Sequence, residues 1–257
     1  MFRPLNEDHA VESVKFALLF TRPLAPKTVA KVESRHELWR DALPAKSRLD
    51  VDVDVNGRTL KAPAVMFGFL KPDANPVWSM QVGANQIEVE CFLYSRWQRV
   101  WETAREHFVG VLDIVAAAQE ALQVRAMHLT VKDVFLSQDG PISAGDMLKP
   151  SNKVPPHALT AKGPWNSYFS WLNEENEDIR TLHACDIDSS FDGEQSSVEV
   201  THMQTRNTGI DIPIGEICGT GFSRLDAIME AMHQSNKGFI SELITNEMAE
   251  RIGLGVK

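Results

Sequence analysis

The sequence predicts an α+β protein made of two similar halves, each an antiparallel sheet followed by a long C-terminal amphipathic helix. Strand-length runs of alternating apolar and polar residues, separated by hairpin-turn residues, indicate the antiparallel strands. Two long stretches, starting at Ser95 and near residue 222, repeat apolar residues at helical spacing. The order of one strand, a connection, about three strands and a long helix occurs twice. We therefore expect halves at 1–122 and 123–257, as two units or as one continuous domain.

The first half begins with a strand over 11–20, which ends in a fully apolar segment typical of a strand covered on both faces. Thr28 is expected to cap a following helix. The buried face of that helix comprises Val29, Val32, His36, Trp39 and Leu43. An antiparallel meander is expected over 47–94, with hairpin turns at Asn56-Gly57 and 83–85. Ser95 and Gln98 form a capping-box pattern, which predicts that the first long helix begins at Ser95 and runs toward residue 122.

The second half repeats this order with a longer connection. A strand is expected over 124–136, with Met127, Leu129 and Val131 on one face. The Pro-rich stretch 138–164 is interpreted as a long surface connection. The remaining expected elements are strands at 165–172, 179–187 and 198–206, a turn at Asp192-Gly193, a Gly-rich loop at 209–221, and a helix over 222–251 with a kink at Gly238.

Composition excludes several classes of protein. The chain has 257 residues and a net charge of −9, so nothing electrostatic favours nucleic acid or an anionic membrane surface. No apolar run approaches the roughly 20 residues of a membrane helix, and residues 1–8 lack the apolar stretch of a signal peptide. Three widely spaced cysteines suit reduced thiols, which favours a cytoplasmic protein.

Several segments resemble one bacterial family. The residues that carry the resemblance are Pro4-Leu5, 11–16, Phe20, Pro23-Leu24, Tyr94-Ser95-Arg96-Trp97, His233 and 238–247. Together they resemble a sporadically distributed bacterial family of uncharacterised proteins of about this length. The region after Arg125 departs from the family pattern, because 130–133 contains neither the aromatic residue nor the Asn. The resemblance implies no transferable activity, and the family's patchy occurrence suggests an accessory or defence-related bacterial system.

Histidines and aspartates of the second half are the candidates for catalysis. His128, His183 and His202 fall on expected strands, where Asp186 and Asp188 would be acidic partners in a hydrolase. No metal-binding or nucleophile motif supports this role, and no metal or cofactor is expected. The acidic run 186–194 departs from a calcium loop, and we interpret it as the end of a hairpin.

The leading functional hypothesis is a non-enzymatic binding or regulatory module that acts through protein contacts, including self-association. Its candidate contact residues are Trp165, Tyr168 and Trp171, which follow the Pro-rich stretch, and Asp50, Asp52 and Asp54, which line one strand face. One alternative is the hydrolase described above. The other is a small-ligand-binding protein with a helix gripping a curved sheet, which requires a cavity between a long helix and its sheet.

Overall fold

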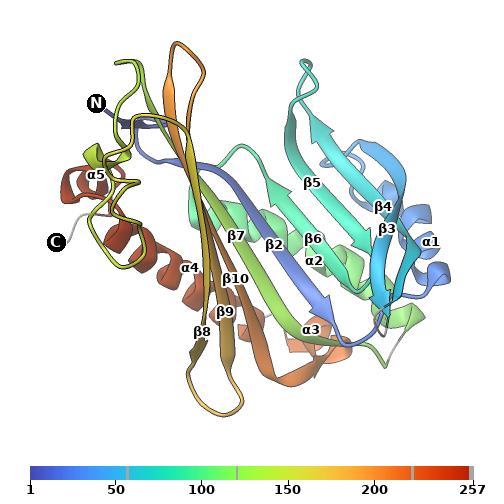
Figure 1. Ribbon diagram of the computed structural model, residues 1–257. Coiled ribbons are helices and arrows are strands. Elements are labelled where there is room, and N and C mark those ends of the chain that lie inside the picture. The colour runs from blue at the N-terminus through green and yellow to red at the C-terminus, as the bar shows by residue number, and fades with distance from the viewer. Residues whose placement is uncertain (56–57, 120, 221–222, 255–257) are drawn as a thin grey trace.

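One antiparallel sheet runs through the whole chain (Figure 1). The computed structural model describes residues 1–55, 58–119, 121–220 and 223–254, without the side chains of 53–58 and 218–222. The strands in spatial order are β3 (Ala45–Val55), β4 (Arg58–Leu70), β5 (Pro76–Gly83), β6 (Gln86–Cys91), β2 (Val11–Phe20), β7 (Gln123–Ser137), β10 (Ser196–Pro213), β9 (Arg180–Phe191) and β8 (Trp165–Glu174). The short strand β1 (Arg3–Pro4) also pairs with β7. The antiparallel pairing of β2 with β7 joins the two expected halves in one sheet.

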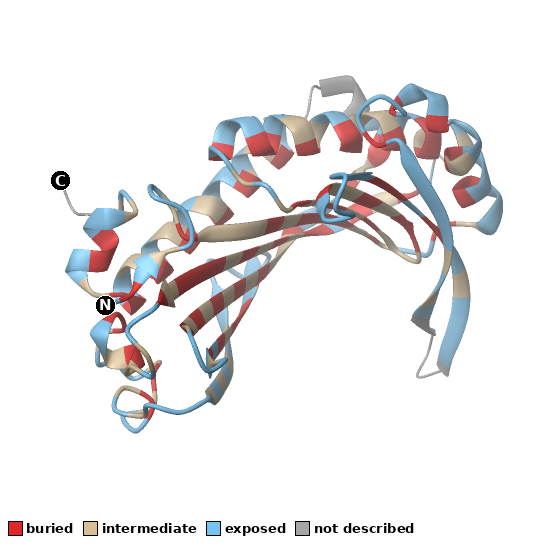
Figure 2. Cartoon of the chain, turned by 90° about the horizontal axis from the view of Figure 1, so that it is seen from above, coloured by how far each residue is buried: buried red, intermediate tan, exposed pale blue. Residues whose placement is uncertain are grey.

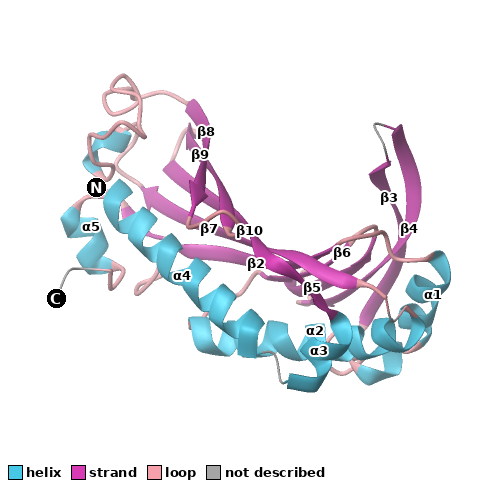
Figure 3. Ribbon diagram, turned by 90° about the horizontal axis from the view of Figure 1, so that it is seen from below, coloured by secondary structure: helices cyan, strands magenta, loops and turns pink. Residues whose placement is uncertain are grey.

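The helices cover one face of this sheet, and the opposite face is concave and carries none of the described helices (Figures 2 and 3). They are α1 (Pro26–Ser34), α2 (Trp97–Ala118), α3 (Ile214–Thr220), α4 (Ser223–Leu243) and α5 (Asn246–Arg251), with 3-10 turns at His36–Leu38 and Ala144–Asp146. Both ends of the sheet, β3–β4 and β8–β9, bend away from the helices (Figure 3). None of the described helices is both long and apolar enough to cross a membrane.

Two hydrophobic cores lie between the helices and the sheet. The first surrounds α2 and includes Phe16, Phe108 and the early α4 residue Met232. The second includes Phe135 and the later α4 residue Phe239. Helix α4 therefore contributes residues to both cores. Its residues between Met232 and Phe239 are part of neither core.

The α+β class and the antiparallel meander are confirmed. The turn after Asp192 is also confirmed, because Gly193 has a φ of 102° and the Asp192 carboxylate accepts the backbone N–H groups of Glu194 and Gln195. At the 83–85 turn, Ala84 takes the positive φ of 51° that the tight connection requires. The expected turn at Asn56-Gly57 lies outside the described residues.

The predicted ends of the long helices were wrong. Helix α2 begins at Trp97, and its N-cap residue Arg96 makes no side-chain capping bond. The expected helix over 222–251 is two helices, because Thr245 leaves the helical path and its hydroxyl accepts the N–H of Met248 to cap α5. The Pro-rich stretch bonds to the chain at this break: Lys149 N–H donates to the Leu243 carbonyl, and Thr245 N–H donates to the Met147 carbonyl.

Three connections also differ from expectation. The stretch 138–164 is not only a surface connection, because it buries Ala144, Met147, Leu148, Val154 and Ala158 against the second core. The expected loop 209–221 is partly strand and partly helix, since β10 continues to Pro213 and α3 follows. Helix α1 ends at Ser34, although all five residues of its predicted apolar face are buried.

Candidate functional site

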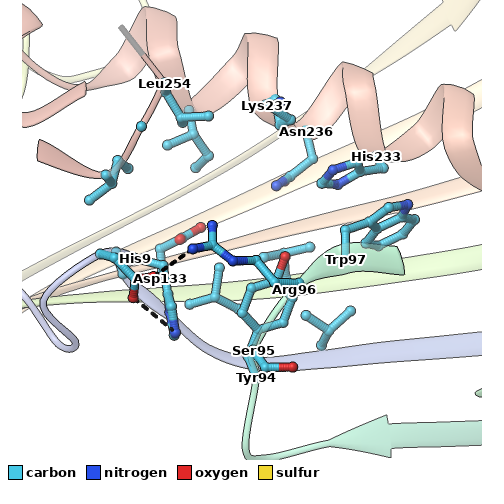
Figure 4. Close-up of a pocket in the computed structure, with 18 of the residues that line it drawn as sticks. His9, Tyr94, Ser95, Arg96, Trp97, Asp133, His233, Asn236, Lys237 and Leu254 are labelled. Atoms are coloured by element: carbon cyan, nitrogen blue, oxygen red, sulfur yellow. Dashed lines mark hydrogen bonds and ion pairs between the residues drawn. The ribbon is translucent and has the colours of Figure 1, made fainter. Parts of the chain in front are cut away.

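A cleft of about 470 Å³ opens on the helix-covered side, between the sheet and the middle of α4 (Figure 4). Its floor includes Val14 of β2 and Val131 of β7, so it lies where the two central strands pair. Its walls come from the segment 94–98 at the start of α2, from 230–240 of α4, and from 250–254 at the end of α5. The cleft therefore occupies the part of α4 that lies between the two cores.

Asp133 on β7 is the most unusual group lining the cleft. Its side chain is on the same strand face as Leu129 and Val131, and the residue is only 3% exposed. Its Oδ2 has no hydrogen-bond partner among the described residues. Burial raises the pKa of this carboxyl from its ordinary value to about 7. The cleft thus contains a carboxyl group that neither a cation nor a complete set of hydrogen bonds from the described chain stabilises.

Tyr94 lies beside this carboxyl group. Burial, and secondly the charge of Asp133, raise the pKa of the Tyr94 phenol to about 12. Its ring meets the His9 ring edge-on, with 5.1 Å between the ring centroids. Tyr94 is therefore a neutral phenol at physiological pH, next to a carboxyl that titrates near pH 7.

The two arginines that line the cleft already have partners. Arg96 donates from Nη2 to Oδ2 of Asp8 at 3.0 Å, and His9 Nε2 lies 3.9 Å from the other carboxylate oxygen of Asp8 (Figure 4). The guanidinium of Arg251 is likewise 2.7 Å from Glu247. These pairs are exposed at the rim and leave Asp133 without a cation of its own.

Aromatic rings form one wall of the cleft (Figure 4). The Trp97 indole stacks on the His233 imidazole with 3.9 Å between centroids and 4° between the planes. Trp97 Nε1 donates to Oε2 of Glu230 at 2.9 Å, which fixes the orientation of the indole. Burial lowers the pKa of His233 to about 4, so the imidazole stacked on Trp97 is neutral at neutral pH.

A series of hydrogen-bonded side chains, which starts at the exposed Asn173 and passes through two buried histidines, reaches the cleft at Asn236. Asn173 Nδ2 lies 3.2 Å from His183 Nε2, His183 Nδ1 lies 3.1 Å from His202 Nε2, and His202 Nδ1 lies 2.8 Å from Asn236 Oδ1. Every contact is satisfied when both imidazoles are neutral with their protons on Nδ1. Burial is the main cause of the lowered pKa of both His183 and His202, which agrees with neutral rings. These hydrogen bonds hold the Asn236 side chain in a fixed orientation in the cleft wall.

The histidines and aspartates expected from the sequence do not form one site. His183 and His202 face α4, whereas His128 faces the concave side and contacts the hydroxyls of Thr205 and Thr130. Asp186 and Asp188 also face away from the histidine pair, and Asp186 accepts a hydrogen bond from Asn166. Within the described part of the chain, no group of three or more His, Cys, Asp or Glu side chains is arranged to hold a metal ion.

The expected contact residues lie at opposite ends of the sheet. Trp165 and Trp171 are half-buried on the helix-facing side of β8, where Trp171 stacks on His183, whereas Tyr168 is 62% exposed on the other side. Asp50 and Asp52 are exposed on β3, and Asp52 pairs with Lys61 at 2.7 Å. The side chain of Asp54 lies outside the described part. β3 and β8 are the two outermost strands, so these two groups of residues lie at opposite edges of the sheet.

The residues that line the cleft were missed in the sequence, although one signal was present. Asp133 follows Met127, Leu129 and Val131 at the two-residue spacing of one strand face, so the sequence pattern places a carboxyl group on the buried face. For Tyr94 and Asn236 no comparable signal exists, because their roles depend on the packing of α4 against β2 and β7.

A comparison with protein-family models finds no match for this chain, and no curated protein matches it.

Proposed function

We propose that this protein binds a small molecule in the cleft between α4 and the centre of the sheet. The observation that carries the proposal is the buried Asp133, whose Oδ2 has no partner among the described residues and which lines a cleft of about 470 Å³. Burying a carboxyl group without a partner destabilises a fold, so its presence beside a cleft favours a ligand that supplies the missing contact.

The size and lining of the cleft support this function. Clefts of roughly 300–1,000 Å³ hold small ligands, which they orient with a few polar groups among apolar and aromatic side chains. Here the apolar part includes Val14, Val131 and the Trp97 ring, and the polar part includes Asp133 and Asn236. The cavity lies between a long helix and its sheet, which is the feature expected of the ligand-binding alternative.

The hydrolase alternative receives less support. His183 and His202 bond to each other and to the amides of Asn173 and Asn236, and neither imidazole lines the cleft. A general base needs access to the substrate proton, whereas both of these rings are buried. The histidine pair therefore fits a structural role behind the cleft wall better than a catalytic one.

The ligand-binding proposal predicts that blocking the mouth of the cleft abolishes binding. Gln234 lines the cleft from an exposed position on α4, so Gln234→Trp fills the mouth at little cost in folding stability. We expect fragments that bind the unmodified protein, detected by saturation-transfer NMR, to lose their signal in this variant.

Ser235→Trp is the matched control for that experiment. Ser235 is the next residue of α4, is also exposed, and does not line the cleft. Binding is expected to persist in this variant. Fragment binding that survives Gln234→Trp, or a protein that binds none of the fragments, contradicts the proposal.

Contact with a second copy of this chain through β8 is a second candidate function. β8 is the outermost strand, and it exposes Tyr168 and Leu172 beside Leu182 of β9, each more than 50% exposed. Leu172 and Leu182 are directly opposite each other in the β8–β9 register, and Tyr168 lies on the same face of β8, four residues before Leu172. Edge strands with apolar side chains pair readily with further strands.

The edge contact predicts a dimer that a charge disrupts. Light scattering at about 100 µM protein is expected to show a dimer, and Leu172→Asp is expected to give a monomer because it buries a charge in the contact. Leu60→Asp, at an exposed position on β4, is the control. A monomeric unmodified protein at that concentration rules out this second function.

We also propose that the two halves share one fold, with the cleft at their junction. From the central pair outward, β2 is followed by β6, β5 and β4, with β3 as a further edge strand, and β7 is followed by β10, β9 and β8. A long helix closes each series, α2 in the first and α4 in the second. Superposing β2–α2 on β7–α4 in chain order tests this relation, and a failure to align the paired strands excludes it.

A further inference from the structure

We infer that the ligand of this cleft is a small organic cation whose ammonium group binds the Asp133 carboxylate. This inference rests on the proposed function and adds the chemical class of the ligand. The ligand's opposite charge satisfies the carboxyl group that the described chain leaves without a partner.

The charged groups around Asp133 leave room for an external cation. Arg96 is engaged by Asp8, and Arg251 by Glu247. Lys237 lies on the α4 wall, where its charge acts on Glu230 and His233. Burial is the cause of the raised pKa of Asp133, and no lysine or arginine among the described residues stabilises its ionised form. An incoming ammonium group meets no competing cation at this carboxyl.

The rest of the cleft also fits a cation better than an anion. The Trp97 ring and the neutral His233 ring form an aromatic wall, and neither ring carries a positive charge that would repel a cation. The carboxylates of Glu230 and Glu250 line the cleft as well. An anionic ligand would instead face the Asp133 carboxyl, and both arginines of the rim are already paired with carboxylates.

The inference is tested with probes that share a shape and differ in charge. They are 2-phenylethylamine, 2-phenylethanol and 3-phenylpropionate, together with butylamine, butanol and butyrate, and each is titrated by calorimetry at pH 8. We expect at least one amine to bind about tenfold or more tightly than its alcohol, and the carboxylates to bind weakest, because truncating or reversing one partner of a buried charge pair costs this much or more.

Substitution of the carboxyl group provides the second arm of the test. Asp133→Asn keeps the shape and removes the charge, so it is expected to reduce amine affinity about tenfold or more while leaving the alcohol affinity unchanged. Glu90→Gln is the control, because Glu90 is a half-buried carboxylate paired with Lys15 outside the cleft. This variant is expected to bind the amines as the unmodified protein does.

The outcomes separate this inference from the proposed function. Equal affinity for amine and alcohol, or amine binding that survives Asp133→Asn, overturns the cation inference. If the alcohol or the carboxylate binds best and Gln234→Trp abolishes that binding, the cleft remains a ligand site with a different ligand class. If no probe binds, the cation inference is rejected, and the fragment experiment with Gln234→Trp decides the proposed function independently.

Discussion

The Asp133→Asn variant is expected to be more stable than the unmodified protein by about 4 kcal/mol at pH 8, and equally stable near pH 4. Burial raises the pKa of this carboxyl from 3.8 to about 7. The folded state therefore keeps a proton that the unfolded state releases between pH 4 and 7. Stability falls as pH rises through this window and is constant above it, and a shift of about three pKa units corresponds to about 4 kcal/mol.

Urea unfolding of both proteins at pH 4.5, 6 and 8 measures this difference. Comparing two variants at each pH cancels the titration of every other group, provided that the substitution leaves those groups unchanged. Asp188→Asn is the control, because Asp188 is exposed on β9, and its effect is expected to be small at every pH. A stability gap that does not widen between pH 4.5 and 8 contradicts the assignment of Asp133 as a buried carboxyl without a cation.

The same substitution links stability to function. An isosteric amide at position 133 is expected to stabilise the fold and to weaken binding of a cation. Groups that destabilise a fold and are retained are characteristic of binding and catalytic sites, where the ligand supplies the missing interaction. If the variant is more stable and binds the cation as well as the unmodified protein does, Asp133 does not contribute to binding of the ligand.

Local patterns in the sequence predicted much of the fold. The alternation over 86–91 and the turn at Asp192-Gly193 depend on neighbouring residues alone, and both are present in the structure. The end of α4 at Leu243 was not predictable in this way, because the Pro-rich stretch bonds to the carbonyl of Leu243 from about a hundred residues earlier in the chain. The start of α2 also differs from the capping-box pattern at Ser95, because the N-cap residue is Arg96 and the helix begins at Trp97.

The candidate site depended still more on long-range packing. The sequence places His128, His183 and His202 on strands but does not fix which of them share a face, and the register puts His128 on the opposite side from the other two. The polar residues of α4, such as His233 and Asn236, interrupt the apolar stripe where the two cores meet. Only the packing of α4 over both β2 and β7 turns that interruption into a cleft.

Buried histidines are expected to lower the free energy of unfolding in acid. His107 provides a test of this effect at a single site. His107 lies on the buried face of α2, where its ring is 6.0 Å from that of Trp78. Burial lowers its pKa from 6.5 to about 4. The unfolded state therefore gains a proton near pH 6.5, before the folded state does, so stability is lost as pH falls from 6.5 to 4. A shift of about 2.5 units corresponds to about 3 kcal/mol.

His107→Leu removes the titrating group and keeps an apolar side chain in the helix. We expect this variant to be more stable than the unmodified protein by about 2–3 kcal/mol at pH 4.5, and to differ at pH 7.5 only through packing, by about 1 kcal/mol. His157→Leu, at an exposed position, is the control and is expected to show no gain in acid. Urea unfolding at the two pH values measures both variants. His107 does not line the cleft. If the two variants gain the same stability in acid, burial of the imidazole is not the cause of that gain.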